Sequence, residues 1–379
     1  MKTNIFKITI LLGYFCFFSQ TGSADEKIII DKTERTYKLY VPAEVQGIIV
    51  ALHPLGGSSS FFFDEYPMKD FADENKYIVL APQALKEQNP TVISTINLLG
   101  TMAGINIPLN AVWGCGMKVN ITSPSMSFEL NANVADVEFI HQIIAKTLVD
   151  YNLPTQNIFI FGVSLGGFMT YLYAEKYPEQ LSGIISIAGS RGLAISNTSD
   201  VALPVLDFHS EQDETIPYGG LLQVKLSGGT TNVDMAQSKP EVIDYWVNRN
   251  GANTVPDVEN VNYYTSTNGI SVTKYTYTQA QGNEVIHYKM TSSTTGVPEH
   301  IYLFSADNGD CMDYAEEIAK FITAHTTDIN INNINKVLPV TAANVVGYYN
   351  ILGQKSSKEP EKGLYIILYD NGNAEKILK

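Results

Sequence analysis

A serine between two glycines, at the point where a strand changes into a helix, is the feature that most constrains this sequence. Residues 157–164 form a continuous apolar run rich in Ile and Phe, which predicts a strand buried on both faces, and residues 165–176 then have a helical pattern. The motif Gly162-Val163-Ser164-Leu165-Gly166 fits a turn so sharp that only glycine is accepted two residues either side of the serine. Such a turn lifts a hydroxyl to the carboxyl end of a sheet, beside a helix N-terminus. We therefore expect Ser164 to be a nucleophile; an ordinary buried serine at a glycine-rich helix start is the alternative.

Strands and helices alternate along most of the chain. Apolar runs rich in β-branched and aromatic residues predict strands at 27–31, 36–42, 47–54, 77–82, 157–164, 181–189, 203–209, 272–278, 284–290 and 300–304. Apolar positions three and four apart predict helices at 63–75, 133–151, 238–251 and 313–325. Alternation of this kind predicts an α/β protein with a doubly wound, mostly parallel sheet.

Two segments depart from the alternation. Residues 83–131 contain many glycines and prolines, and we interpret them as an inserted loop or lid that shapes a binding site. Beyond Thr327 the composition shifts to Asn, Thr and β-branched residues, and the turn formers at 370–372 join two predicted strands. The sequence therefore predicts one large domain at 25–327 and a small β module at 328–379.

The first 24 residues predict a signal peptide. Lys2 and Lys7 precede an apolar run at 8–18, and Gly22 and Ala24 are small residues at cleavage spacing. The run is too short to cross about 30 Å of hydrocarbon. We expect a protein that is secreted or held at the cell surface, with a retained anchor or lipid attachment at Cys16 as the alternative.

Charge and cysteine content narrow the range of partners. The chain has a formal net charge of −14 and no basic cluster, which argues against nucleic-acid binding. After signal removal two cysteines remain, Cys115 and Cys311, which in an oxidising compartment form either one disulfide or two buried thiols. The acidic residues around Asp310 do not have calcium-loop spacing, and the sequence leads us to expect no metal and no cofactor.

A glycine-containing loop after the strand at 47–54 is a candidate oxyanion hole. Backbone N–H groups at Leu55 and Gly56 can turn toward a substrate without side-chain obstruction, and Leu165 follows the nucleophile. These three residues are the expected donors. A plain turn between a strand and a helix is the alternative.

The order of these segments resembles the esterase branch of α/β hydrolases that contains poly(3-hydroxybutyrate) depolymerases, feruloyl esterases and acetyl xylan esterases. The matching pieces are LHPLGG, VADVEFI, IFIFGVSLGGFMT, YPEQLSGIISIAG and LPVLDFHSEQDETIPY. The resemblance covers about residues 41–325 and implies the α/β-hydrolase fold, no cofactor, and an ester or polysaccharide-ester substrate. Its last piece implies that Asp213 is the acid of a catalytic triad, with a turn aspartate that caps backbone amides as the alternative.

The same resemblance implies a departure at the catalytic base. The family has a histidine after a glycine just before the final helix, where this chain has Gly309 and Asp310. Asp310 therefore occupies the expected histidine position, and a carboxylate is a poor base for a hydroxyl. The sequence indicates an incomplete triad of Ser164, Asp213 and Asp310.

Among the six histidines, two are candidate substitute bases. His53 and His209 follow predicted strands at the catalytic edge, although support of the oxyanion loop and of the acid loop is the alternative for each. His300 begins a predicted strand and is expected near the opposite edge of the sheet. The remaining histidines, expected away from the site, are His141, His287 and His325.

Two functional hypotheses follow. The first is a secreted serine carboxylic-ester hydrolase that acts on feruloyl or acetyl esters of plant polysaccharides, or on polyester. The second is a catalytically impaired hydrolase-fold protein that binds a saccharide or ester ligand through the old pocket.

The C-terminal module resembles the sorting domains of the type IX secretion system of Bacteroidetes. The matching pieces are GYYNILGQK, KGLYII and EKILK. The resemblance implies that the module contacts secretion machinery and has no chemical role. A structural or carbohydrate-contacting β appendage is the alternative.

Overall fold

A computed structural model of the chain describes residues 22–226, 228–293, 300–301 and 304–327, and in the C-terminal part residues 345–350, 355–356, 358, 360, 364–369 and 374–378. The chain divides into two units, Met1–Thr327 and Asp328–Lys379. The predicted signal peptide lies outside the described residues except for its last three positions, which begin the first strand. Across the described part of the chain, no helix has the length and apolar character needed to cross a membrane.

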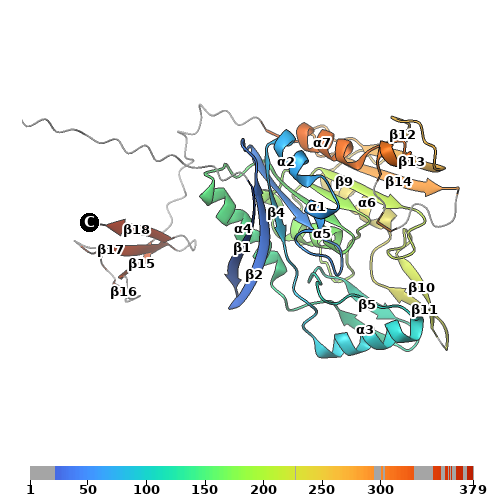
Figure 1. Cartoon of the computed structure of the whole chain (residues 1–379), viewed down its shortest axis with the longest axis horizontal. Helices are drawn as coiled ribbons and strands as arrows, with labels where there is room; N and C mark the ends of the chain where they lie inside the picture. Colours follow the sequence, from blue (N-terminus) through green and yellow to red (C-terminus); the bar gives the residue numbers. More distant parts are fainter. Residues whose placement is uncertain are drawn as a thin grey trace, which may run out of the picture. The chain divides into compact units, whose positions relative to one another are not determined.

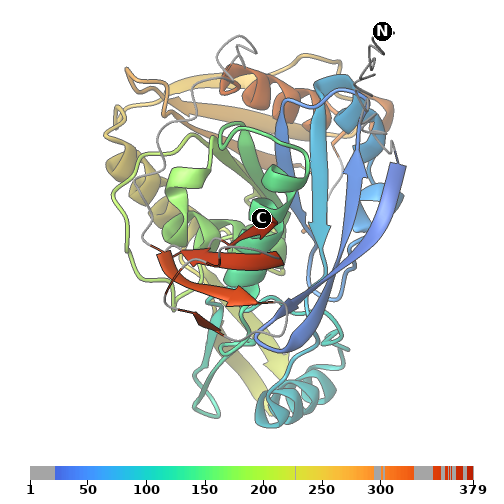
Figure 2. The same cartoon turned by 90° about the vertical axis from the view of Figure 1, so that its left-hand side faces the viewer.

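A ten-stranded sheet forms the centre of the first unit (Figures 1 and 2). The order of its strands is β1-β2-β4-β3-β7-β8-β9-β14-β13-β12. The strands are β1 (Gly22–Ile30), β2 (Thr33–Val41), β3 (Gly47–Leu52), β4 (Tyr77–Pro82), β7 (Ile158–Val163), β8 (Gly183–Ile187), β9 (Val205–Ser210), β12 (Asp257–Val261), β13 (Ile270–Tyr277) and β14 (Val285–Ser292). The six central strands from β4 to β14 run parallel, and the outer strands pair antiparallel. The predicted mostly parallel α/β sheet is confirmed.

Helices cover both faces of this sheet, because successive side chains of its buried strands point to opposite sides. Ile48 and Val50 belong to a core that includes residues of α4 (Asp136–Asp150), α5 (Leu165–Lys176) and α6 (Lys239–Asn250). Ile49 and Ala51 belong to a second core with α2 (Met68–Asn75) and α7 (Tyr314–Ala324). The helix predicted at 63–75 is in fact two, α1 (Phe61–Asp64) and α2, with a proline immediately before the second.

The two cysteines lie in different cores, on opposite faces of the central sheet. Cys115 lies in the core that includes α4, α5 and α6, whereas Cys311 lies in the core that includes α2 and α7. Both are free, buried thiols, and burial raises the pKa of each. The disulfide considered from the sequence is therefore wrong, because the central sheet lies between the two side chains.

The segment at 83–131 has more regular structure than a loop. Its helix α3 (Pro90–Ala103) begins after Asn89, whose side chain accepts the N–H of Thr91, and ends at Gly104 in the left-handed conformation. Its hairpin, β5 (Lys118–Ile121) and β6 (Met126–Glu129), joins a second hairpin, β10 (Leu221–Leu226) and β11 (Gly229–Asp234). Together they form a four-stranded antiparallel sheet in the order β10-β11-β5-β6, close to α3 (Figure 1).

The second unit contains a four-stranded antiparallel sheet in the order β16-β15-β17-β18. Its strands are β15 (Val345–Asn350), β16 (Lys355–Ser356), β17 (Leu364–Tyr369) and β18 (Ala374–Leu378). The pairing of β17 with β18 is the one that the turn formers at 370–372 predict.

Candidate active site

Ser164 lies in the sharp turn between β7 and α5. Its backbone has φ 54° and ψ −119°, a conformation that is rare outside glycine and is found mainly at functional sites. A Cβ atom added at Gly162 would lie 2.2 Å from the carbonyl oxygen of Gly166, and one added at Gly166 would lie 2.0 Å from that of Leu52. The two glycines of the motif are therefore required by close backbone contacts, and the predicted strand-turn-helix geometry is present.

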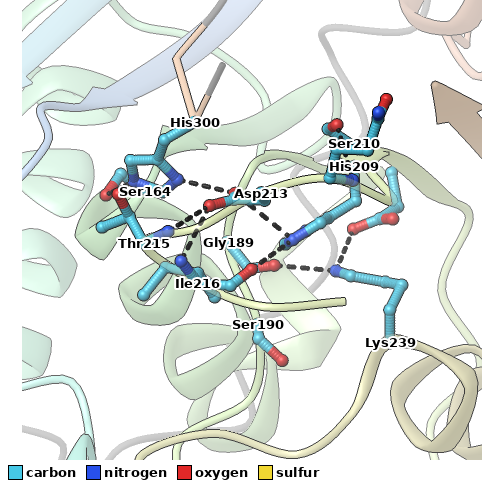
Figure 3. A network of polar contacts seen from close by, with 12 residues as sticks. Ser164, Gly189, Ser190, His209, Ser210, Asp213, Thr215, Ile216, Lys239 and His300 are labelled. Atoms are coloured by element: carbon cyan, nitrogen blue, oxygen red, sulfur yellow. Dashed lines mark hydrogen bonds and ion pairs between the residues drawn. The ribbon is translucent and has the colours of Figure 1, made fainter. Parts of the chain in front are cut away.

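His300 connects the serine to Asp213. The Ser164 Oγ donates to Nε2 of His300 over 2.7 Å, and Nδ1 of the same ring donates to Oδ2 of Asp213 over 2.7 Å (Figure 3). Ser164 and Asp213 are buried, whereas 15% of the His300 side chain is exposed. A hydroxyl, an imidazole and a carboxylate in this order have the geometry of a catalytic triad.

The expectation that His300 lies near the opposite edge of the sheet is therefore wrong, because its ring contacts Ser164. The strand composition of residues 300–304 predicts that they end the parallel sheet, but the strand that pairs with β9 in parallel is β14. The chain leaves β14 after Ser292 at the edge of the sheet where Ser164 also lies, and His300 follows from there. Neither His300 nor Ile301 is in a strand, and residues 294–299 and 302–303 lie outside the described residues.

Asp310 has a different environment from the one the sequence suggested. Its buried carboxylate accepts the N–H of Ser305 over 3.0 Å and the side-chain amide of Asn268. Gly309 before it has φ 80°, which completes a tight turn ahead of α7. The expectation that Asp310 occupies the position of the catalytic base is wrong. Its carboxylate instead links the loop at 305–310 to Asn268.

Asp213 is held on both of its carboxylate oxygens. Oδ1 accepts the N–H groups of Thr215 and Ile216, each over 2.8 Å, and Oδ2 accepts the proton of His300. Burial alone would raise the pKa of this carboxyl, but the hydrogen bond and charge of His300, the charge of His209 and the N–H of Ile216 together hold it below the ordinary value. The site therefore keeps an anion beside the imidazole.

The two candidate substitute bases are engaged elsewhere, so that expectation is also wrong. In His53, Nδ1 donates to the carbonyl of Pro54 over 2.7 Å and Nε2 accepts the N–H of Ala84 over 3.1 Å. In His209, Nε2 donates to the carbonyl of Ile216 over 2.8 Å and lies 3.4 Å from Asp213 Oδ2 (Figure 3). Burial lowers the pKa of each ring to about 4. The two rings support the loops that hold the site.

Two of the three expected oxyanion donors are free, one in the loop after β3 and one at the start of α5. The N–H of Gly56 donates to the carbonyl of Ala111 over 2.8 Å, so this residue is not available and its expected role is wrong. Leu165 opens α5, where an N–H has no partner within the helix. Among the described residues, the N–H of Leu55 has no hydrogen-bond partner either. Leu55 and Leu165 both line the cavity of about 520 Å³ that reaches Ser164 and His300.

Part of the sequence is similar to known ester hydrolases. A family model described as Phospholipase/Carboxylesterase matches residues 122–228, which include Ser164 and Asp213. Feruloyl esterase B of Neurospora crassa is 27% identical over 143 residues, which cover 37% of this chain and 39% of the relative. A probable acetylxylan esterase A of Aspergillus flavus is 24% identical over 165 residues, or 43% of this chain and 44% of the relative. The chain thus spans less than half the length of these two relatives.

Among solved structures, an acetyl xylan esterase from Aspergillus awamori has a TM-score of 0.47 and 14% sequence identity, over 79% of this chain and 99% of that one. The topology described above, with its nucleophile turn after a central parallel strand, is that of an α/β hydrolase. The chain has the α/β-hydrolase fold, and the sequences that it resembles are those of carboxylic-ester hydrolases.

Proposed function

We propose that this protein is an exported serine carboxylic-ester hydrolase with a complete triad of Ser164, His300 and Asp213. The supporting observation is the unbroken hydrogen-bond chain from the Ser164 Oγ through the His300 ring to Asp213. The similarity to esterases supports the same reaction class. Binding without turnover, the second hypothesis from the sequence, depended on a missing histidine and is favoured by no contact in the site.

The chemistry follows from the contacts. Nε2 of His300 takes the proton of Ser164 as its Oγ attacks the ester carbonyl, and Asp213 fixes the imidazole tautomer and stabilises the imidazolium. The N–H groups of Leu55 and Leu165 bind the oxyanion. His300 then gives the proton to the leaving alcohol, which leaves an acyl group on Ser164. Water, activated by the same imidazole, releases the acid and restores the serine.

Names of the relatives supply the first candidate substrates. Feruloyl and acetyl esters of plant polysaccharides correspond to the names of the two relatives, and a polyester corresponds to the depolymerase resemblance. We keep these three as the starting set, in which the ester bond is the shared target.

Export is part of the same proposal. Residues 1–24 have the signal-peptide pattern, and residues 328–379 resemble a secretion sorting module. Expression of the full chain and of a chain that ends at Thr327, in a Bacteroidetes host, tests the second point. We expect the full chain in the medium or on the cell surface and the shortened chain retained in the periplasm; equal distribution of the two would remove the sorting role.

The decisive test of the reaction is hydrolysis of 4-nitrophenyl acetate by the mature protein beside its Ser164→Ala variant. We expect turnover that falls at least about a thousandfold with the substitution, because the nucleophile is lost. Ser271→Ala, which changes an exposed serine on β13, is the matched control and should behave like the parent. A parent that turns over no ester, or one whose turnover survives Ser164→Ala, would remove the proposal.

A further inference from the structure

We propose that the cavity beside Ser164 binds the saturated hydrocarbon chain of an ester, about six to twelve carbons long, in preference to an acetyl or a feruloyl group. The inference rests on the proposed function, because it names the substrate class of that same site. It is drawn from the composition and size of the cavity walls.

One wall is the inner face of the second sheet. Along β10, Leu222, Val224 and Leu226 line the cavity, whereas the residues between them are exposed on the other face. This alternation is the pleat of a strand with one apolar side. The other strands of this sheet add further apolar lining residues, which are Val119 and Ile121 of β5, Phe128 of β6 and Val233 of β11.

The facing wall is α3, the helix of the insertion. Ile96, Leu99 and Ala103 line the cavity at spacings of three and four residues, which places them on one face of the helix. The helix packs against β10, as Figure 1 also shows at the lower edge of the first unit. The insertion and the second sheet therefore enclose an apolar space that begins at the nucleophile.

Polar lining side chains are concentrated at the catalytic end and the exposed rim. Ser164 and His300 form the catalytic end, and the remaining polar side chains of the rim, Asn106, Glu214 and Thr215, are exposed. Among the described residues of the sheet wall, Thr231 alone has a polar side chain in the cavity, and its Oγ1 already accepts the N–H of Ser123 over 3.0 Å.

This wall suits a hydrocarbon chain better than a ferulic acid ring. A site built for a hydroxyl places hydrogen-bond partners where that hydroxyl will lie, and a phenol buried without them loses the free energy of its hydration. A saturated chain has no such requirement and gains from every methylene group removed from water.

The size of the cavity separates long chains from acetyl. The cavity volume of about 520 Å³ is far larger than the volume that one water molecule occupies in the liquid, roughly 30 Å³. An acetyl group would leave most of the apolar wall uncovered. Each buried methylene improves binding by up to about fourfold, so a chain with six more methylenes should gain well over tenfold.

The hydrocarbon chain can belong to the acid part or to the alcohol part of the ester, and two pairs of substrates distinguish these possibilities. 4-Nitrophenyl octanoate against 4-nitrophenyl acetate changes the acyl side, and octyl acetate against ethyl acetate changes the alcohol side. We expect kcat/KM to be at least about tenfold higher for the long member of one pair. No gain in either pair, or a higher kcat/KM for methyl ferulate than for methyl octanoate, would overturn the proposal.

Paired variants on β10 connect the preference to the cavity. Val224→Phe adds a ring inside it, whereas Lys225→Phe adds the same ring on the exposed face of the same strand. The ratio of kcat/KM for the long ester to that for the short one should fall at least about tenfold in the first variant and stay at the parent value in the second. Ala103→Phe, on α3, repeats the test from the facing wall if Val224→Phe does not fold. A ratio unchanged in the folded cavity variants would overturn the proposal.

Failure of the inference and failure of the proposed function give different results. Hydrolysis that depends on Ser164 but does not depend on chain length removes the inference and leaves the esterase. If no ester is hydrolysed, the esterase proposal fails, and calorimetric binding of 1-octanol to the parent and to Val224→Phe then decides the nature of the cavity ligand. Binding that the substitution weakens supports a hydrocarbon ligand, and no binding to the parent removes it.

Discussion

Nε2 of His300 lies 2.7 Å from Oγ of Ser164, although the two residues are 136 positions apart in the chain. The central sheet explains the contact, because β7 and β14 run in the same direction and end at the same edge. Asp213 follows β9, which lies between β7 and β14 in the sheet, and its carboxylate contacts the His300 ring. The site is thus built from the carboxyl ends of three parallel strands, where α/β proteins place their ligands.

Replacement of His300 by alanine should abolish turnover almost as completely as loss of the serine. We expect His300→Ala to lower kcat for 4-nitrophenyl acetate by about 10⁴ to 10⁶, and the double variant with Ser164→Ala to be no worse, because triad residues act as a unit. Steady-state kinetics of the two single variants and the double variant provide the test.

His141→Ala is the matched control for this prediction. His141 is a half-buried residue of α4 whose ring lies on Tyr177 and bonds Gln180, away from the contacts of Ser164. It should keep the parent kcat. If His300→Ala keeps more than about a tenth of the parent rate, the base is another group and the triad assignment is wrong.

Two aspartates should respond in opposite ways to the same substitution. Asp213→Asn should lower kcat by about 10⁴, because the amide no longer fixes the tautomer of His300. Asp310→Asn should leave kcat near the parent value and lower the free energy of unfolding by about 1–3 kcal/mol, since it weakens the bonds to Ser305 and Asn268. Kinetics and urea unfolding of both variants test this contrast, and a large loss of kcat in folded Asp310→Asn would restore that residue to the site.

A methyl group added at Gly56, beside Leu55, should disturb the protein more than one added at Gly104, which has the same backbone conformation. Gly56 and Gly104 have nearly equal φ values of 71° and 72°, but a Cβ at Gly56 would lie 2.6 Å from the Pro108 ring and one at Gly104 would have no neighbour within 4 Å. Alanine in the left-handed conformation costs about 1–2 kcal/mol at either position.

Gly56→Ala should therefore lower both stability and kcat/KM, because the clash displaces the neighbouring Leu55 N–H. Gly104→Ala should lower stability alone. The measurement is kcat/KM for 4-nitrophenyl acetate together with urea unfolding. Equal kcat/KM in the two variants would show that the loop does not take part in the reaction.

The sheet and the sharp turn at Ser164 could be predicted from the sequence because both depend on local patterns. Continuous apolar runs defined the buried parallel strands, and two glycines two residues from Ser164 defined its turn. The hairpin β10-β11 was missed, although the alternation in residues 221–226 and the glycines at 228–229 are a hairpin signal.

The contact of His300 with Ser164 could not be predicted, because it depends on which strand ends the parallel sheet. Residues 284–290 and 300–304 both have strand composition, so either segment can be expected to end the sheet. Pairing of β14 with β9 is a long-range contact that no local pattern specifies. With that register, His300 follows the last parallel strand.

Stability should fall as the pH is lowered from about 6.5 toward 4, because burial lowers the pKa of three histidines, His53, His209 and His287. Burial lowers the pKa of His53 and of His209 from 6.5 to about 4, so the unfolded chain binds protons at these rings where the folded chain does not. Each ring therefore lowers the free energy of unfolding by up to about 1.4 kcal/mol for every pH unit that the pH falls within this window.

Urea unfolding at pH 7.5, 6.0 and 5.0 measures this slope. His53→Gln should unfold at lower urea at pH 7.5, since it disturbs the bonds to Pro54 and Ala84, yet lose less stability on acidification than the parent. Ser271→Ala, which changes an exposed serine on β13, is the control and should keep the parent slope. A destabilised His53→Gln variant still gives this difference in slope, because the slope does not depend on the absolute stability. Parallel curves for the parent and His53→Gln would mean that the ring is protonated in the folded protein at the same pH as in the unfolded chain, which its burial and its bond from the Ala84 N–H oppose.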